Sequence, residues 1–355
     1  MMMSDTITIP VSKNPNTNFQ NIDIYNCPFG KIPTDHMMIC DFKDGTWQMP
    51  EIVPFKNFEM SPFSRVFHYG QAIFEGMKAY KDEQDDIWLF RPDENQKRFN
   101  SSAKRMAIPE LPEEFFMEGV RKLVEIERNW IPKGFGNSLY IRPFIIATEP
   151  GILAAPSNEY RFVVIVAPAN AYYYSDVKVV IAERYSRAAN GGVGAAKVAG
   201  NYGAQFYPTQ LAIKEGYQQI IWTDDVEHKY LEESGTMNVF FRINDILITA
   251  PTSDRILDGV TRKSLITLAK NKGIKVEERP ISVDELKAAY KVGELKEIFG
   301  TGTAAVITPI VSFAHQNIEY PLNKQEDSFA LKLKQDLLNI QYNVSKDLFG
   351  WRQKV

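Results

Sequence analysis

The sequence predicts a two-domain protein of the mixed α/β (α+β) class, with helices and strands in both halves. The chain has 355 residues, which is the length of two domains of ordinary size. Apolar residues make up 44% of the chain, enough for sizeable hydrophobic cores. Strand-like and helix-like apolar spacings occur in both halves, and no single long series of βαβ units links them.

The predicted domain boundary lies where proline interrupts a strand pattern. Pro168-Ala169-Asn170-Ala171 follows a run of apolar residues and is the expected start of a linker. We therefore expect a small N-terminal domain over residues 1–167, a linker over 168–176 and a larger C-terminal domain over 177–355.

Apolar periodicity predicts the elements of the N-terminal domain. Strands are expected at 36–42, 87–90, 138–142 and 162–167, and helices at 93–106, with Asp93 as N-cap, and at 113–129. Side chains two residues apart on a strand point to the same face. Tyr140 and Arg142 should therefore share one face of their strand.

The C-terminal domain shows the same mixture of patterns. Strands are expected at 177–181, 219–222, 230–233, 238–243, 246–249 and 297–299, and helices at 205–215, 262–271, 283–290 and 328–341. The strands at 238–243 and 246–249 flank Asn244-Asp245 and form a predicted hairpin.

Charge and cysteine content exclude several classes of function. The net charge is −3, and the sequence has neither a basic stripe for nucleic acid nor a polybasic run for an anionic membrane. Cys27 and Cys40 are the only cysteines, and the four histidines lie far apart, so neither a disulfide framework nor a metal site is expected. With no apolar run of membrane-spanning length and no leader-like start, we expect a cytoplasmic protein.

One lysine stands in a segment of small residues just past the middle of the chain. Lys197 lies within 191–203, where glycine and alanine predominate. Packing that removes water from a lysine favours its neutral amine, which can form a Schiff base with an aldehyde such as that of pyridoxal phosphate. A flexible loop with a solvated lysine is an equally good reading of this stretch alone.

Two further loops offer donors for a phosphate. Gly259-Val260-Thr261 precedes a predicted helix, and Gly300-Thr301-Gly302-Thr303-Ala304 follows a predicted strand. Each one alone is equally an ordinary turn. Glu233, at a strand end, could hold the pyridine nitrogen of a cofactor protonated, or could be a solvated glutamate. Two such loops and a lysine of this kind together favour a phosphorylated cofactor.

An ordered set of motifs carries a family resemblance. In chain order the motifs are Phe29-Gly30-Lys31, His68-Tyr69, Phe74-Glu75-Gly76-Met77-Lys78-Ala79, Leu89-Phe90-Arg91-Pro92, Tyr140-Ile141-Arg142-Pro143, Gly191-Gly192-Val193-Gly194, Lys197, Gly200-Asn201-Tyr202-Gly203, Glu233-Ser234-Gly235-Thr236-Met237-Asn238 and Phe299-Gly300-Thr301-Gly302-Thr303-Ala304. With these motifs the chain resembles the branched-chain amino-acid aminotransferases, pyridoxal-phosphate enzymes of fold type IV. The resemblance runs from about Phe29 to the last predicted helix.

The resemblance implies a cofactor site in a two-domain fold whose larger C-terminal domain binds pyridoxal 5′-phosphate. It implies that Lys197 binds the cofactor covalently and moves the proton during catalysis. The other implied cofactor contacts are Tyr202 at the phenolic oxygen, Glu233 at the pyridine nitrogen, and Arg98, Val260, Thr261 and Thr303 at the phosphate, with Thr236 close by.

The resemblance also implies a substrate pocket and a homodimer. The substrate carboxylate would meet Thr236, Tyr140, Thr303 and Ala304, and Arg142 would accept the distal carboxylate of glutamate. The implied pocket lining is Phe29, Phe74, Tyr140, Tyr172 and, from the other subunit, Tyr69, Ile152, Leu153 and Ala154. The implied reaction moves the amino group of leucine, isoleucine or valine to 2-oxoglutarate by a ping-pong mechanism.

One departure from the family concerns regulation. Mammalian members carry a Cys-x-x-Cys redox switch after the Gly-Thr loop, and Ala305 and Thr308 stand at those positions here. Thiol-based switching is therefore not expected. The alternatives to a branched-chain aminotransferase are another fold-type-IV enzyme, namely a D-amino-acid aminotransferase or an aminodeoxychorismate lyase, and a non-enzymatic phosphate-binding or scaffold protein.

Overall fold

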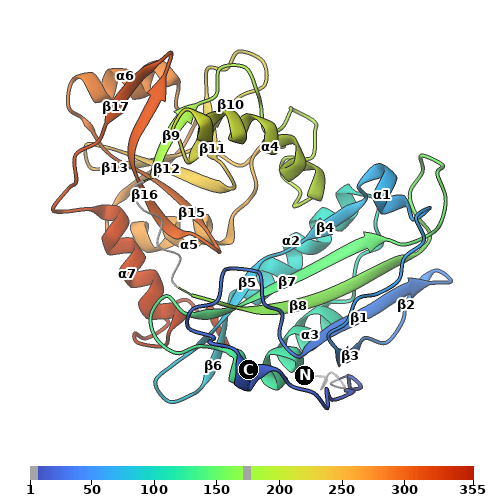
Figure 1. Cartoon of the computed structure of the whole chain (residues 1–355). Coiled ribbons are helices and arrows are strands. Elements are labelled where there is room, and N and C mark those ends of the chain that lie inside the picture. Colours follow the sequence, from blue (N-terminus) through green and yellow to red (C-terminus); the bar gives the residue numbers. More distant parts are fainter. Residues whose placement is uncertain (1–6, 171–176) are drawn as a thin grey trace, which may run out of the picture. The chain divides into compact units, whose positions relative to one another are not determined.

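The computed structural model describes residues 7–170 and 177–355. The chain divides into two compact units. The first comprises Met1–Tyr172, Lys197–Ala199 and Asn339–Val355, and the second comprises Tyr173–Ala196 and Gly200–Leu338. Each unit is built on a nine-stranded sheet with helices packed against it, so the mixed class predicted from the sequence is confirmed (Figure 1).

The sheet of the first unit is antiparallel in all its paired strands. Its main path runs β18-β6-β5-β7-β8-β1-β2, with β3 beside β1 and β4 beside β7. The strands are β1 (His36–Lys43), β2 (Thr46–Trp47), β3 (Glu51–Pro54), β4 (Ala72–Phe74), β5 (Met77–Lys81), β6 (Ile87–Phe90), β7 (Ser138–Ala147), β8 (Tyr160–Ala169) and β18 (Arg352–Lys354).

Two helices cover this sheet through an aromatic core. The helices of the unit are α1 (Arg65–Tyr69), α2 (Pro92–Arg105) and α3 (Glu113–Ile126), with short 3-10 turns at Phe19–Asn21 and Arg128–Trp130. Phe99 of α2, Phe116 of α3 and Phe162 of β8 are all fully buried, and their ring centroids lie 5.5–6.1 Å apart. Burying three such rings contributes roughly 5–9 kcal/mol to folding, which anchors both helices on one face of the sheet.

The second unit has a mixed sheet that closes on itself. The order is β11-β10-β9-β16-β15-β12-β13-β14, with β17 beside β16, and β11 also pairs with β12. The strands are β9 (Val177–Ile181), β10 (Gln219–Thr223), β11 (Leu231–Ser234), β12 (Met237–Ile243), β13 (Ile246–Thr249), β14 (Lys275–Glu278), β15 (Leu295–Gly302), β16 (Val306–His315) and β17 (Ile318–Pro321).

Alternate side chains of these strands enter two separate cores. Val179 and Ile221 pack with Leu286 of α6 (Val283–Lys291), whereas Ile220 and Trp222 pack with Ala212 of α4 (Ala199–Lys214). The period of two along a strand places successive side chains on opposite faces, which is why β10 serves both cores. The remaining helices are α5 (Val260–Asn271) and α7 (Phe329–Gln341).

Several predicted boundaries need correction. Asp93 is not the N-cap of α2: Pro92 occupies the first turn after Arg91, because its fixed φ suits that position. β8 continues through Pro168 to Ala169, so the strand pattern does not stop at this proline. Residues 171–176 of the predicted linker, including Tyr172, lie outside the described residues.

The start of α4 was predicted too late. The helix begins at Ala199, although glycines at 200 and 203 are poor helix formers and suggested a loop up to 205. The amide of Asn201 donates to the carbonyls of Val193 and Ala196 at 2.8 and 3.0 Å. These side-chain hydrogen bonds tie the first turn to the loop immediately before it.

Candidate active site

Lys197 belongs to the first unit, and its backbone is hydrogen-bonded there. Its carbonyl accepts from the Phe74 amide at 3.0 Å, and its own amide donates to the Ser102 hydroxyl at 2.9 Å. Val198 pairs with Ile73, so the segment adds to the edge of β4. Lys197 is half-buried, with its Nζ 4.8 Å from the centroid of the Phe74 ring. This arrangement holds one amine against an aromatic face, a favourable place for a cation.

Arg98 is held by a buried carboxylate in the same unit. Its Nε and Nη2 donate to Oε1 and Oε2 of Glu75 at 2.7 and 2.9 Å. Glu75 is 0% exposed. The desolvation that accompanies burial would raise the pKa of Glu75, but the positive charge and hydrogen bonds of Arg98 hold that pKa below its usual value.

Tyr140 and Arg142 share a face of β7, as predicted. Both are partly buried, whereas Leu139 and Ile141 between and beside them are fully buried. Nη2 of Arg142 donates to the Tyr140 hydroxyl at 3.1 Å. The guanidinium carbon lies 4.8 Å from the centroid of Phe74, the ring that also faces Lys197.

Two neighbours complete this aromatic cluster. Phe29 packs edge-on against Tyr140 with centroids 5.0 Å apart. Gly76 leaves space for the phenol, because a Cβ at position 76 would lie 2.2 Å from the Tyr140 hydroxyl. The structure therefore brings Phe29, Phe74, Tyr140 and Arg142 together around the lysine-bearing segment.

Tyr69, Ile152 and Leu153 form a separate, exposed group in this unit. The Tyr69 hydroxyl donates to the Ile152 carbonyl. The three side chains are 45%, 62% and 68% exposed. Large apolar side chains exposed together are typical of a protein–protein contact surface.

Glu233 lies buried in the second unit. Its Oε2 pairs with Nε of Arg187 at 2.9 Å, and its Oε1 accepts from the Leu257 amide at 2.6 Å and from Nδ2 of Asn238 at 3.3 Å. The solvated-glutamate alternative is therefore wrong. A buried carboxylate facing an arginine is stabilised in its ionised form.

The predicted phosphate loops gather near this carboxylate. Val260 and Thr261 open α5 and are 6% and 8% exposed. Gly259 before them packs on Asn238, since a Cβ there would lie 2.0 Å from the Asn238 Oδ1. Asn238 is also the ladder partner of Thr301, whose buried Oγ has no hydrogen-bond partner among the described residues.

The remaining predicted residues lie in turns and at a helix start. Thr303 and Ala304 form the turn between β15 and β16, and Thr236 is an exposed residue of the turn between β11 and β12. Tyr202 lies in the first turn of α4 and is partly buried. The roles assigned to these residues stay predictions.

The family follows from comparison with known proteins. A model of amino-transferase class IV matches residues 72–313, a span that contains Phe74, Lys197 and Glu233. The chain belongs to the class IV aminotransferases. Branched-chain-amino-acid aminotransferase 2 of Bacillus subtilis is 44% identical over 332 residues, which cover 92% of each chain. A probable branched-chain-amino-acid aminotransferase of Staphylococcus epidermidis is 45% identical over 339 residues, 94% of each chain.

Solved branched-chain aminotransferases share the fold. The T.th. branched-chain amino acid aminotransferase, complexed with N-(5'-phosphopyridoxyl)-L-glutamate, aligns with a TM-score of 0.70 at 26% identity, covering 88% of this chain and 97% of that one. The branched-chain aminotransferase of Thermoproteus uzoniensis with norvaline aligns with a TM-score of 0.73 at 25% identity, covering 90% and 99%. The predicted family and fold class are confirmed.

Two residues of this aminotransferase received no role from the sequence. Glu75 belongs to a quoted motif, but only the folded chain shows its pairing with Arg98. Arg187 carries no signal of its own, because nothing in its local sequence distinguishes it from Arg184 three residues earlier. Its contact with Glu233 depends on the order of the sheet. β10 lies between β9 and β11, and this order brings the loop after β9, which holds Arg187, close to the end of β11.

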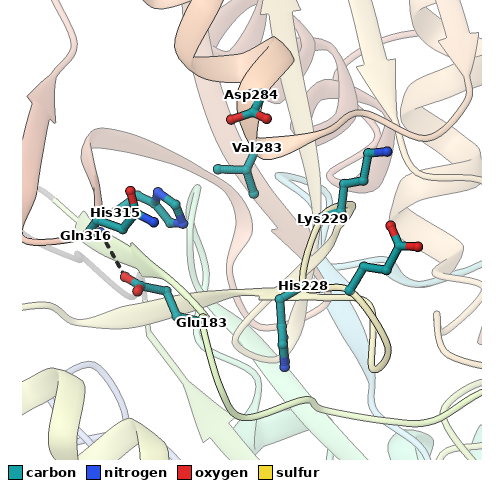
Figure 2. A pocket seen from close by; sticks show the side chains of 8 residues that line it. Glu183, His228, Lys229, Val283, Asp284, His315 and Gln316 are labelled. Carbon is teal, nitrogen blue, oxygen red and sulfur yellow. Dashed lines mark hydrogen bonds between the residues drawn. The ribbon is translucent and has the colours of Figure 1, made fainter.

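The aminotransferase also has a surface hollow of about 390 Å³ in the second unit, lined by side chains that include His228, His315, Glu183 and Asp284 (Figure 2). The backbone amide of Gln316 donates to Glu183 there at 2.8 Å. None of the described predicted site residues lines this hollow.

Within 7–170 and 177–355, no cluster of histidine, cysteine or acidic side chains could hold a metal ion, and no helix is long and apolar enough to cross a membrane.

Proposed function

We propose that this class IV aminotransferase moves the amino group of leucine, isoleucine or valine to 2-oxoglutarate, using pyridoxal 5′-phosphate. The observation that carries the proposal is the Phe74 ring. Nζ of Lys197 and Cζ of Arg142 each lie 4.8 Å from its centroid. The proposed reactive amine and the proposed carboxylate-binding cation are therefore neighbours of one aromatic ring, as a pocket for both alkyl and acidic side chains requires.

The residues present fit the proposed cofactor. Glu233 is a buried, arginine-paired carboxylate, which suits a protonated pyridine nitrogen. Gly259 packs against Asn238 just before Val260 and Thr261 open α5, and the Thr301 hydroxyl is buried without a partner among the described residues. Helix-start amides, threonine hydroxyls and the Arg98 guanidinium are the donors that bind phosphate. The related T.th. enzyme was solved with a phosphopyridoxyl-glutamate ligand.

When bound, pyridoxal phosphate supplies an aldehyde and an electron-withdrawing ring that acidifies the Cα–H of the amino acid. Lys197 would accept the proton from Cα of the amino acid and would deliver it to C4′ of the cofactor. Glu233 would keep the ring nitrogen protonated, and Tyr202 would donate to the phenolic oxygen. Arg98, Val260, Thr261 and Thr303 hold the phosphate in this proposal.

The substrate pocket is proposed to accept two kinds of side chain. Phe29, Phe74 and Tyr140 supply an apolar surface for a branched alkyl chain. Arg142 supplies the partner for the distal carboxylate of glutamate, a charge-assisted contact. Thr236 and the turn at Thr303-Ala304 are proposed to receive the carboxylate that every substrate shares.

The second copy in the proposed homodimer would cover the exposed group around Tyr69. Phe63 and Phe67, next to it in sequence, are 57% and 61% exposed. Together with Ile152 and Leu153 they form an apolar surface on the first unit that a second copy could bury. Light scattering should give twice the chain mass, and Phe67→Glu should shift the protein toward the monomer.

The two free, buried cysteines suit the cytoplasm, the proposed location.

An amino-donor panel tests the proposal. The purified protein should transfer nitrogen from leucine, isoleucine and valine to 2-oxoglutarate and should show a visible absorbance band that borohydride removes. Transfer from D-amino acids, or release of product from aminodeoxychorismate, would instead favour the other fold-type-IV enzymes.

Lys197→Ala tests the central residue of that proposal. The variant should lose essentially all turnover and the absorbance band while keeping its melting temperature. Lys334→Ala, which removes another partly buried lysine, should retain both turnover and the absorbance band. Substantial turnover of Lys197→Ala without an added amine would overturn the assignment.

A further inference from the structure

Glu75 is a buried carboxylate between β4 and β5 to which no role has been given. Its side chain is 0% exposed, and four hydrogen bonds converge on it. Arg98 provides two of them, Nδ2 of Asn95 provides one at 2.8 Å, and the Gly76 amide provides one at 3.0 Å. Such a complete set of donors keeps the carboxylate in one orientation.

The geometry fixes the plane of the Arg98 guanidinium. Nε and Nη2 both engage the carboxylate, one to each oxygen, in the parallel two-bond arrangement that arginine favours. A guanidinium held at two points cannot rotate about its Cδ–Nε bond without breaking one of them. The planar group is therefore oriented before any ligand arrives.

Glu75 is also joined to the lysine-bearing segment through its neighbour. The Phe74 amide donates to the Lys197 carbonyl at 3.0 Å, and the Glu75 amide donates to the Pro143 carbonyl at 2.7 Å. The negative charge of Glu75 interacts favourably with Lys197. One short stretch of chain thus contacts the segment of Lys197, the β7 strand of Tyr140 and Arg142, and the Arg98 side chain.

We propose that Glu75 is a positioning residue, which orients Arg98 to bind the phosphate of the cofactor. This inference rests on the proposed function, because it takes Arg98 as a phosphate ligand. A simple structural ion pair would affect only the stability of the unit. A positioning role instead predicts that removing the carboxylate weakens recognition of phosphate selectively.

Glu75→Gln is the variant to test. When the amide oxygen of glutamine takes the place of Oε2, the contacts with Asn95 and Gly76 are kept. The NH₂ group then takes the place of Oε1, where a donor faces the donor Nε of Arg98 and their hydrogen bond is lost. The apoenzyme should bind pyridoxal 5′-phosphate about tenfold to hundredfold more weakly, the loss expected for a charge-assisted contact. Binding of pyridoxal, which lacks the phosphate, should be unchanged. Both affinities are measured on apoenzyme by fluorescence quenching and need no turnover.

The first unit offers a matched control. Arg161 binds Asp41 with the same two-bond geometry, Nε to Oδ1 at 2.6 Å and Nη2 to Oδ2 at 2.9 Å. Asp41→Asn should lower the melting temperature without changing the ratio of the two affinities. If Glu75→Gln is too unstable to purify, Asn95→Ala removes one donor from the carboxylate and should change the ratio in the same direction by a smaller factor.

The outcomes separate the two proposals. Wild-type apoenzyme that binds pyridoxal as tightly as pyridoxal phosphate would overturn the phosphate assignments of the proposed function. If the wild type prefers the phosphate and Glu75→Gln keeps or increases that preference, then Glu75 only neutralises Arg98 and the positioning role is wrong. A selective loss in Glu75→Gln that Asp41→Asn does not share supports it.

Discussion

Nε of Arg187 lies 2.9 Å from Oε2 of Glu233, and the two side chains are 5% and 3% exposed. The same guanidinium donates from Nη1 to the Arg255 carbonyl at 2.6 Å and from Nη2 to the Gly194 carbonyl at 3.1 Å. Gly194 is required there, because a Cβ would lie 2.7 Å from that Arg255 carbonyl oxygen. Arg187 therefore holds both the carboxylate and the loop that precedes Lys197 in sequence.

Glu233→Gln tests the role of the carboxylate. We expect both half-reactions to slow by about tenfold to hundredfold, since the proposed charge-assisted hydrogen bond between Glu233 and the ring nitrogen would be lost. Affinity for the phosphate should change little. Stopped-flow absorbance measures each half-reaction, and Glu227→Gln, at an exposed carboxylate of the surface hollow, is the control. Equal rates in wild type and Glu233→Gln would leave the residue a purely structural role.

Arg142→Met should separate the two substrates. Its guanidinium can pair with the distal carboxylate of 2-oxoglutarate. That contact is worth roughly 1.5–3 kcal/mol, so the glutamate half-reaction should slow by about tenfold to hundredfold. Leucine has no such carboxylate and should lose much less, apart from the effect of removing the 3.1 Å bond to Tyr140. Arg121→Met, on α3, should leave the rates of both half-reactions unchanged. An equal fall in the leucine and glutamate half-reactions would make Arg142 a scaffold residue.

Mild oxidation should not switch the enzyme off. Burial, aided by the neighbouring charge of Asp41, raises the pKa of Cys40 to about 12, and burial also raises the pKa of Cys27. Both thiols therefore stay protonated near neutral pH, and it is the thiolate that reacts with oxidants. At the positions of the mammalian switch, the Thr308 hydroxyl donates to the Ala305 carbonyl at 3.3 Å. Inactivation by peroxide that a thiol reductant reverses would contradict this expectation.

Val306→Gly should stabilise the second unit. Val306 follows the Thr303-Ala304 turn with φ +58°, and among the described residues it is the only β-branched one with a positive φ. Such strain costs about 1–3 kcal/mol, and glycine would relieve it at an entropic cost of about 0.5–1 kcal/mol. We expect the free energy of unfolding to rise by about 1 kcal/mol, measured in urea. Gln316→Gly, at φ +53° in the next hairpin, is the matched control, because it replaces a residue of similar φ that is not β-branched. A loss of stability confined to Val306→Gly would show that packing of the valine outweighs its strain.

Local patterns predicted the elements whose signals lie within a few residues. β6 and β9 have the predicted bounds, because short apolar runs between turn residues mark both ends. β4 and β5 were not predicted, since Gly70 and Gly76 interrupt their pattern. They form because each pairs with β7, a strand more than sixty residues further along, as in Phe74 opposite Phe144.

The sequence by itself determined the mixed fold class, the family, and which lysine and which strand-end glutamate to examine, because ordered motifs and local periodicity carry that information. Only the tertiary structure decided how the charges pair: Glu75 with Arg98, 23 positions away, and Glu233 with Arg187. The physical reason is that such a pair depends on strand register and on helix packing, which bring distant residues within 3 Å of each other. No local spacing encodes which buried carboxylate will meet which guanidinium.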